Sequence, residues 1–297
     1  MSLGGLIAPG FFSNGPVRAA LLTGGVVAVV TAVVGIFTVL RRQSFAGHTL
    51  GEVGTTGGSA AFLAGVNPLW GFVAIALVAA GAIELVGVRR PRQRDLAAGL
   101  VLGAGLGLAA LFLYLGSVTS PASGGASTSI LFGSIFIIGP SMVSSIVALS
   151  AGALALIALC GRRMLLVSLH PDLAASRGVR LRLVGAIYLL ALAIAVSLAA
   201  ETIGAVLATA LLVGPPATAL RLTRRPGRAL VAASLVGVAA VWLGILLSYD
   251  SYTWPPAGRT WPVSFFVVAL VLVFYLAAQL PVRRLRARPR ARARGEV

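Results

Sequence analysis

The residues best suited to bind a ligand lie close together, between residues 47 and 60. His48 and Glu52 are four positions apart, so on a helix their side chains share one face and can reach one point. An imidazole and a carboxylate form part of a ligand set for zinc, manganese or iron(II). Thr55 and Ser59 continue that face with hydroxyl oxygens. The alternative is that His48 and Glu52 only satisfy each other within a contact between helices.

A stripe of glycines runs beside these polar residues. The glycines recur at spacings of 4, 3 and 4 positions and so lie along one helical face. They are Gly47, Gly51, Gly54 and Gly58. Small residues on such a face let a neighbouring helix approach closely. The segment is therefore expected to be a closely packed helix that presents the imidazole and the carboxylate.

Few other side chains could bind a metal ion, because the chain holds only seven acidic residues and two histidines. Glu201 and Asp250 fall at expected outer turns, where each is either a gate or access point for an ion or a solvated acid. Near an arginine cluster, Pro171 and Asp172 are typical of a helix start and Gly178 of its stop. This short helix is either a lever for a partner protein or only a capped connector.

The elements that carry these residues are expected to lie in a membrane. The chain has 297 residues, of which 58% are hydrophobic and 10% charged. Residues 19–40 form an apolar run without a charge, and about 20 such residues cross a bilayer. Further runs of this kind follow along the chain. They are continuous rather than alternating, which favours a bundle of transmembrane helices over a barrel.

The arginines indicate how the chain crosses the membrane. All 24 cations are arginines and the net charge is +17. Most of the arginines fall in five clusters, within residues 41–42, 89–94, 162–182, 221–228 and 283–294. Apolar stretches long enough for two crossings separate the clusters, which is the pattern of cytoplasmic loops. We therefore expect about nine helices (between eight and ten), an outer N-terminus and a cytoplasmic C-terminus, and no binding of nucleic acid.

The apolar stretches between these clusters predict the individual crossings. The expected segments are 19–40, two within 47–88 that turn at 67–68, two within 96–160 with an outer loop at 117–129, two within 182–221 that turn at 201–204, and 229–248 and 263–280 joined by the loop 249–261. A short re-entrant piece is expected at 131–138. Pro215 and Pro216 are expected to kink or end their helix.

The chain is expected to form one permease domain over residues 1–282, followed by a disordered arginine-rich tail at 283–297 that lies on anionic lipid. The first apolar run is expected to be a permanent helix. One cysteine, Cys160, excludes an intrachain disulfide. Without a lysine, a standard Walker A motif cannot form. The chain is therefore expected to be neither an enzyme nor an ATP-driven pump on its own.

Three segments resemble the permease subunits of metal-uptake ABC importers, the zinc, manganese or iron type. They are RRQSFAGHTLGEVG with GVNP following, HPDLAASRGVRLR, and GAVLATALLVGPPATALRL. The resemblance extends from about Arg41 to Leu280, and the last segment is its most specific part. In that family an Asp and a His at this spacing on the second helix are implicated in the metal pathway. They correspond in position to His48 and Glu52, in reversed order.

The resemblance implies a fold, partners and a role. The fold would be the all-α bundle of type II ABC importer permeases, similar to the cobalamin importer, in a bacterial plasma membrane. Two permeases would pair with cytoplasmic ATPases and an extracytoplasmic metal-binding protein, and the metal would be cargo rather than a bound cofactor. Asp172, Ala175 and Gly178 would lie in the segment that faces the ATPase. The alternatives are an ion-coupled secondary transporter and an ABC permease for a metal chelate.

Overall fold

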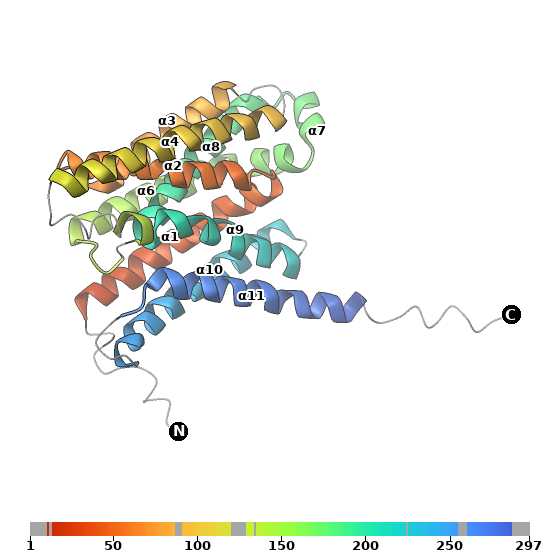
Figure 1. The fold of residues 1–297 in the computed structure, drawn as a ribbon. Helices are drawn as coiled ribbons and strands as arrows, with labels where there is room; N and C mark the ends of the chain where they lie inside the picture. Colours follow the sequence, from red (N-terminus) through yellow and green to blue (C-terminus); the bar gives the residue numbers. More distant parts are fainter. Residues whose placement is uncertain are drawn as a thin grey trace.

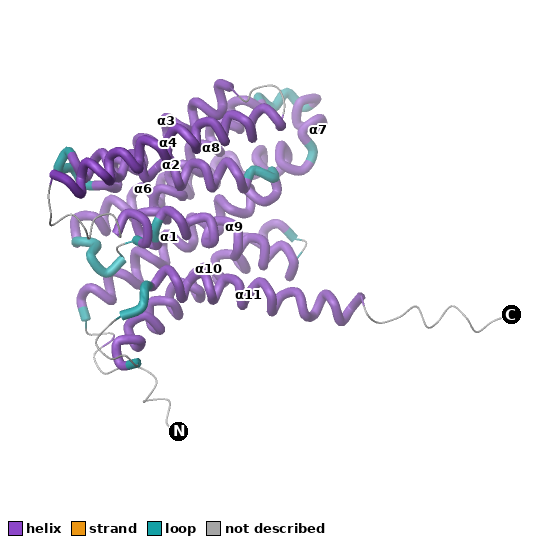
Figure 2. Tube along the Cα trace, viewed as in Figure 1, coloured by secondary structure: helices purple, strands orange, loops and turns teal. Residues whose placement is uncertain are grey.

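The computed structural model describes residues 11, 14–86, 91–119, 129–133, 135–223, 225–254 and 260–286. Nine long helices and one short helix make up most of this part of the chain, and it contains no strand (Figures 1 and 2). The helices are α1 (Gly15–Leu40), α2 (Ser44–Leu63), α3 (Pro68–Val86), α4 (Pro91–Thr119), α6 (Pro140–Leu169), α7 (Pro171–Ser176), α8 (Leu181–Ile203), α9 (Ala205–Leu222), α10 (Pro226–Asp250) and α11 (Val263–Arg286).

The long helices run back and forth across the molecule. The start of α1 lies at one end, and α7 and the last turns of α11 lie at the other (Figure 1). Arg41 and Arg42 follow α1, and the clusters at 162–182 and 221–228 surround the α6–α8 and α9–α10 connections. Each of these follows a crossing in the same direction, so these arginines share the end that carries α7. This is the order of crossings expected from the sequence.

Eight of these helices are long and apolar enough to span a membrane, and α2 is the exception. Glycines and polar residues dilute its apolar character, but α2 is surrounded by α3, α4, α8 and α9. A Cβ atom on Gly57 would lie 1.9 Å from the carbonyl oxygen of Gly71 on α3, so the two helices touch through their backbones. Thr56 of α2 donates a hydrogen bond of 2.6 Å to the carbonyl of Gly105 on α4. Neighbouring helices therefore shield the least apolar crossing from lipid.

Helices α8 and α9 form the tight hairpin expected from the sequence, and Gly204 alone connects them. Its φ of +106° lies where residues with a Cβ atom are strained. In the region of the expected re-entrant piece, residues 129–132 form one helical turn, and Gly133 follows with a φ of +84°. Gly133 and Gly204, both with positive φ angles, thus lie in two neighbouring turns of the chain.

Helix α9 continues through Pro215 and Pro216 to Leu222, so the two prolines do not end it. Pro216 has no N–H to donate to the carbonyl of Leu212. That carbonyl oxygen faces α1, where a Cβ atom on Gly35 would lie 2.0 Å from it. At the C-terminal end, α11 continues to Arg286, into the arginine-rich tail expected at 283–297. The rest of that tail lies outside the described residues.

Candidate functional site

His48 lies one turn into α2 and makes its hydrogen bond to another helix. Its Nδ1 atom is 3.1 Å from the hydroxyl oxygen of Thr209 on α9. Helices α2 and α9 pack together along this contact, and both side chains are half-buried. The polar part of the imidazole is thus held between two crossings, while part of the ring stays accessible.

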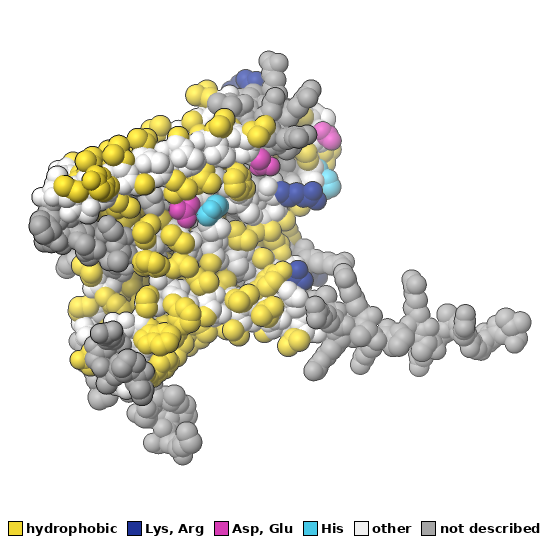
Figure 3. Space-filling model, in the orientation of Figure 1, with side chains coloured by type: hydrophobic (Ala, Val, Ile, Leu, Met, Phe, Trp, Pro, Cys, Tyr) yellow, Lys and Arg dark blue, Asp and Glu magenta, His cyan; other side chains and the backbone are white. Residues whose placement is uncertain are grey.

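Glu52 lies one turn further along α2 and is 8% exposed. It is close enough to His48 for the two side chains to interact electrostatically. Figure 3 shows an imidazole and a carboxylate next to each other on a largely hydrophobic face of the bundle. Within the described part of the chain, the Glu52 carboxylate has no hydrogen-bond partner. The hydrogen bond of the imidazole thus goes to Thr209 and not to Glu52.

Two ligands are too few to enclose a divalent cation. Among the described residues, no group of three His, Cys, Asp or Glu side chains could hold a metal ion. A site with open positions suits a transported ion, which must be released after it binds. An ion held by His48 and Glu52 would therefore need further ligands from water or from another chain.

The rest of the predicted polar stripe is turned into the protein. Thr55 is 1% exposed and Ser59 is fully buried. The Thr55 hydroxyl donates to the carbonyl of Glu52 over 2.5 Å, and the Ser59 hydroxyl donates to the carbonyl of Thr55 over 2.7 Å. Each hydroxyl still has lone pairs, but the accessible part of the stripe ends at Glu52.

The glycine stripe of α2 faces three different helices. A Cβ atom on Gly47 would lie 2.5 Å from a Leu212 methyl on α9, and one on Gly51 would lie 2.9 Å from a Val196 methyl on α8. Gly54 and Gly58 both lie against the ring of Phe72 on α3. The stripe therefore seats the helix that carries His48 and Glu52 among its neighbours.

The comparison with known proteins identifies the family. Residues 15–279 match the model of the ABC 3 transport family. The chain belongs to this family. The resemblance to the permease subunits of metal-uptake ABC importers is thereby confirmed, and the chain is a multi-pass protein of a bacterial membrane.

Relatives of this ABC 3 permease are about a quarter identical to it over the aligned residues. Manganese transport system membrane protein MntC of Listeria innocua is 25% identical over 244 residues, which cover 82% of this chain and 85% of the relative. Manganese import system permease protein ScaB of Streptococcus pneumoniae is 27% identical over 236 residues, which cover 78% of this chain and 81% of the relative. The solved structure of PsaBC from Streptococcus pneumoniae in complex with Fab superimposes with a TM-score of 0.76 at 22% identity, over 91% and 92% of the two chains. This likeness confirms the helical permease fold.

Two further predicted residues of the permease, Glu201 and Asp250, lie at the end of the bundle opposite α7, apart from His48. Glu201 is in the last turn of α8 and only 7% exposed, so it does not face water. Within the described residues its carboxylate has no hydrogen bond or ion pair. Asp250 ends α10 and accepts a hydrogen bond of 3.2 Å from the indole nitrogen of Trp254 in an exposed loop.

Helix α7 of the permease lies on the surface between α6 and α8. Asp172 and Ala175 are exposed, whereas Ala174 is fully buried and anchors the helix. Gly178, with a φ of +71°, ends it, and its N–H donates to the carbonyl of Ala175 over 3.0 Å. The sequence signals for the start and stop of this helix, Pro171 and Gly178, therefore coincide with its bounds.

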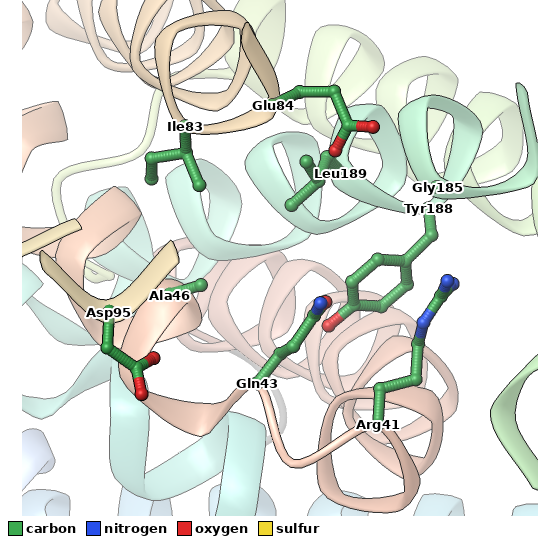
Figure 4. A pocket seen from close by; sticks show the side chains of 9 residues that line it. All are labelled: Arg41, Gln43, Ala46, Ile83, Glu84, Asp95, Gly185, Tyr188 and Leu189. Carbon is green, nitrogen blue, oxygen red and sulfur yellow. The ribbon is translucent and has the colours of Figure 1, made fainter. Parts of the chain in front are cut away.

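A small cavity of about 20 Å³ lies between α2, α3, α4 and α8, beside Arg41 (Figure 4). This volume is close to the minimum that one water needs, so the cavity is no ligand site. Tyr188 of α8 borders it and donates a hydrogen bond of 3.0 Å to Thr38 of α1. The guanidinium carbon of Arg41 lies 4.6 Å from the centroid of the Tyr188 ring. This cluster attaches the end of α1 to α8.

Sequence reasoning missed Thr209, the residue that bonds to His48. Thr209 lies 161 positions from His48 in the chain. Its hydroxyl is the polar group of a segment that is otherwise apolar on both sides. A polar side chain inside an apolar crossing is a signal for an interhelical hydrogen bond, but nothing in the sequence indicates its partner. The contact between Gly57 and Gly71 was missed for the same reason.

Proposed function

We propose that this permease is the membrane subunit of an ABC importer that takes up a divalent metal ion, with His48 and Glu52 as ligands along the path. The observation that carries this proposal is the Glu52 carboxylate, nearly buried and without a hydrogen bond in the described chain, beside a half-exposed imidazole. A carboxylate at membrane depth is costly unless a cation or another polar group neutralises it. A metal ion passing the pair supplies that charge.

Manganese is the first candidate substrate, followed by zinc and iron. The relatives MntC and ScaB carry manganese in their names. One nitrogen and one carboxylate oxygen donor suit manganese, iron(II) and zinc alike. The choice among them therefore depends on ligands beyond these two, which water or a second permease chain would supply.

The permease has no ATP-binding motif of its own in its sequence, so it needs partners. In our proposal cytoplasmic ATPases bind at α7, through the exposed residues Asp172, Ala175 and Gly178. An extracytoplasmic metal-binding protein delivers the ion at the opposite end, near Glu201 and Asp250. Two permeases pair so that the site alternates between the two sides of the membrane. The arginine-rich end faces the cytoplasm, as basic loops do in membrane proteins.

Uptake by reconstituted vesicles tests the proposal. Proteoliposomes would hold the permease and its ATPase, with the metal-binding protein supplied on the outer side, and radioactive manganese, zinc and iron would be offered in turn. ATP-dependent accumulation of one metal is expected, and Glu52→Gln or His48→Gln should reduce it to background. His170→Gln is the matched control, since His170 is exposed beside α7 and should leave uptake unchanged.

Three outcomes would contradict all or part of the proposal. Uptake that needs an ion gradient but neither ATP nor the ATPase would point to a secondary transporter. Uptake of a chelate but of no free metal would point to a chelate permease. Unchanged uptake by both the His48 and Glu52 variants would remove the site while leaving the family assignment intact.

A further inference from the structure

Thr209 of α9 contacts His48, one of the two residues of the proposed metal site. A neutral imidazole has one nitrogen that carries a proton and one that carries a lone pair. The Nδ1 atom of His48 is already engaged, 3.1 Å from the Thr209 hydroxyl. Only Nε2 is left to bind a metal, and it has a lone pair only when the ring proton is on Nδ1.

We propose that Thr209 is the positioning residue of this site, because its hydroxyl accepts the Nδ1–H of His48 and so presents the Nε2 lone pair to the metal. The inference rests on the proposed function of His48. A histidine that binds a metal usually donates its other ring N–H to an oxygen, which fixes the tautomer and the ring orientation. Here that oxygen comes from a different helix, α9, rather than from the helix that carries the ligands.

The surroundings of Thr209 support this role. In the described chain the Thr209 hydroxyl makes no hydrogen bond other than the one to His48. Two other threonines nearby in the bundle instead donate to their own helix. Thr218, also on α9, donates over 2.8 Å to the carbonyl of Gly214, and Thr202 on α8 donates over 2.9 Å to the carbonyl of Leu198. The Thr209 hydroxyl is not tied to its own helix, so it can rotate to accept the Nδ1–H that the ring must carry when Nε2 binds a metal.

Three variants separate positioning from packing. Thr209→Val keeps the shape of the side chain but removes the hydroxyl, and Thr209→Ser keeps the hydroxyl but removes the methyl group. Thr218→Val is the matched control, since it removes a hydroxyl from the same helix without touching His48. If the valine variant fails to assemble, Thr209→Ala gives the same comparison.

Uptake kinetics with manganese alone give the first measurement. Thr209→Val should raise the KM for manganese roughly 10- to 100-fold, the usual effect of losing a group that orients a metal ligand, with a much smaller change in maximal rate. Thr209→Ser should restore most of the lost affinity, and Thr218→Val should behave as wild type. If Thr209→Val has a wild-type KM, or if serine fails to rescue it, the inference is wrong.

The imidazole itself gives the second measurement. The chain has two histidines, so the His170→Gln variant with ¹⁵N-labelled rings reports on His48 alone. With zinc as a diamagnetic probe, the wild-type ring should show a protonated Nδ1 and a metal-bound Nε2. Thr209→Val should show a mixture of tautomers before zinc is added. Identical spectra for the two proteins would overturn the inference.

The same experiments separate this inference from the proposed function. If His48→Gln abolishes uptake while Thr209→Val does not affect it, the site stands and the positioning role falls. If His48→Gln itself transports normally, both fall together.

Discussion

Gly133 and Gly204 lie in two turns that pack backbone to backbone at the end of the bundle opposite α7. A Cβ atom on Gly133 would lie 2.5 Å from the carbonyl oxygen of Thr202, and one on Gly204 would lie 2.3 Å from that of Leu131. Both glycines have positive φ angles, +84° and +106°. The helical turn at 129–132 is thereby seated on the turn between α8 and α9, next to the buried Glu201.

Replacing Gly204 with alanine should destabilise the permease. A left-handed residue with a Cβ atom costs roughly 1–2 kcal/mol, and the clash with Leu131 adds to it. Thermal unfolding of the protein in detergent measures the effect. The control is Gly99→Ala on α4, where a Cβ atom meets nothing within 4 Å. Equal stabilities of the two variants would show that the two turns do not pack in this way.

The Tyr188 hydroxyl should contribute to stability. Tyr188 and Thr38 are both fully buried, and the hydrogen bond between them joins α8 to α1. Tyr188→Phe should lower the free energy of unfolding by about 1 kcal/mol, the usual net contribution of a hydrogen bond.

Tyr275 provides a matched control for this prediction. Its hydroxyl accepts a hydrogen bond of 2.8 Å from Arg221, and its ring lies 4.9 Å from the guanidinium carbon, but the bond is exposed. Water can replace an exposed partner, so Tyr275→Phe should cost less than Tyr188→Phe. Thermal unfolding of both variants under one set of conditions compares them, and the reverse order would refute the prediction.

Changes on the exposed side of α7 should uncouple ATP hydrolysis from transport. Ala175→Glu places a charge on the surface proposed to meet the ATPase, whereas the buried Ala174 still anchors the helix. We expect hydrolysis to continue while metal uptake per ATP falls several-fold. A mismatched charge at a protein interface can weaken the contact by several kcal/mol. Simultaneous assays of phosphate release and uptake check this. An unchanged ratio would mean that the ATPase binds elsewhere.

Gly178→Ala is a second test of the same surface. Gly178 has a φ of +71° and open space where a Cβ atom would lie, so the change strains only the end of α7. It should also lower uptake per ATP. Gly161→Ala on α6 is the control, because its surroundings are also open and it lies in a regular helix.

The order of the crossings could be predicted because it depends on signals that can be read along the sequence without knowing any contact between helices. Arginine clusters mark one end of the bundle, and apolar length fixes how many crossings lie between them. Helix α2 is less apolar than the others, but its glycine spacing indicates a closely packed helix. The hairpin at Gly204 was predicted because only about 18 residues were available for each leg.

Contacts between distant helices could not be predicted. The partner of His48, Thr209, lies 161 positions away, and periodicity on α2 gives no information on which face of α9 meets it. The burial of Glu201 likewise depends on packing around the end of α8. Pro215 and Pro216 were expected to kink or end α9; the helix continues past both, so they do not end it, and the kink stays a prediction. The packing of Leu212 against Gly35 of α1 supports this part of the helix.

Pulsed electron paramagnetic resonance of manganese bound to the purified permease shows whether His48 is a ligand of the ion. If the ion binds the imidazole of His48, the spectrum should contain a nitrogen hyperfine coupling that His48→Gln abolishes and His170→Gln leaves intact. Manganese that binds without any nitrogen coupling, or a coupling that survives in His48→Gln, would show that His48 does not bind the ion.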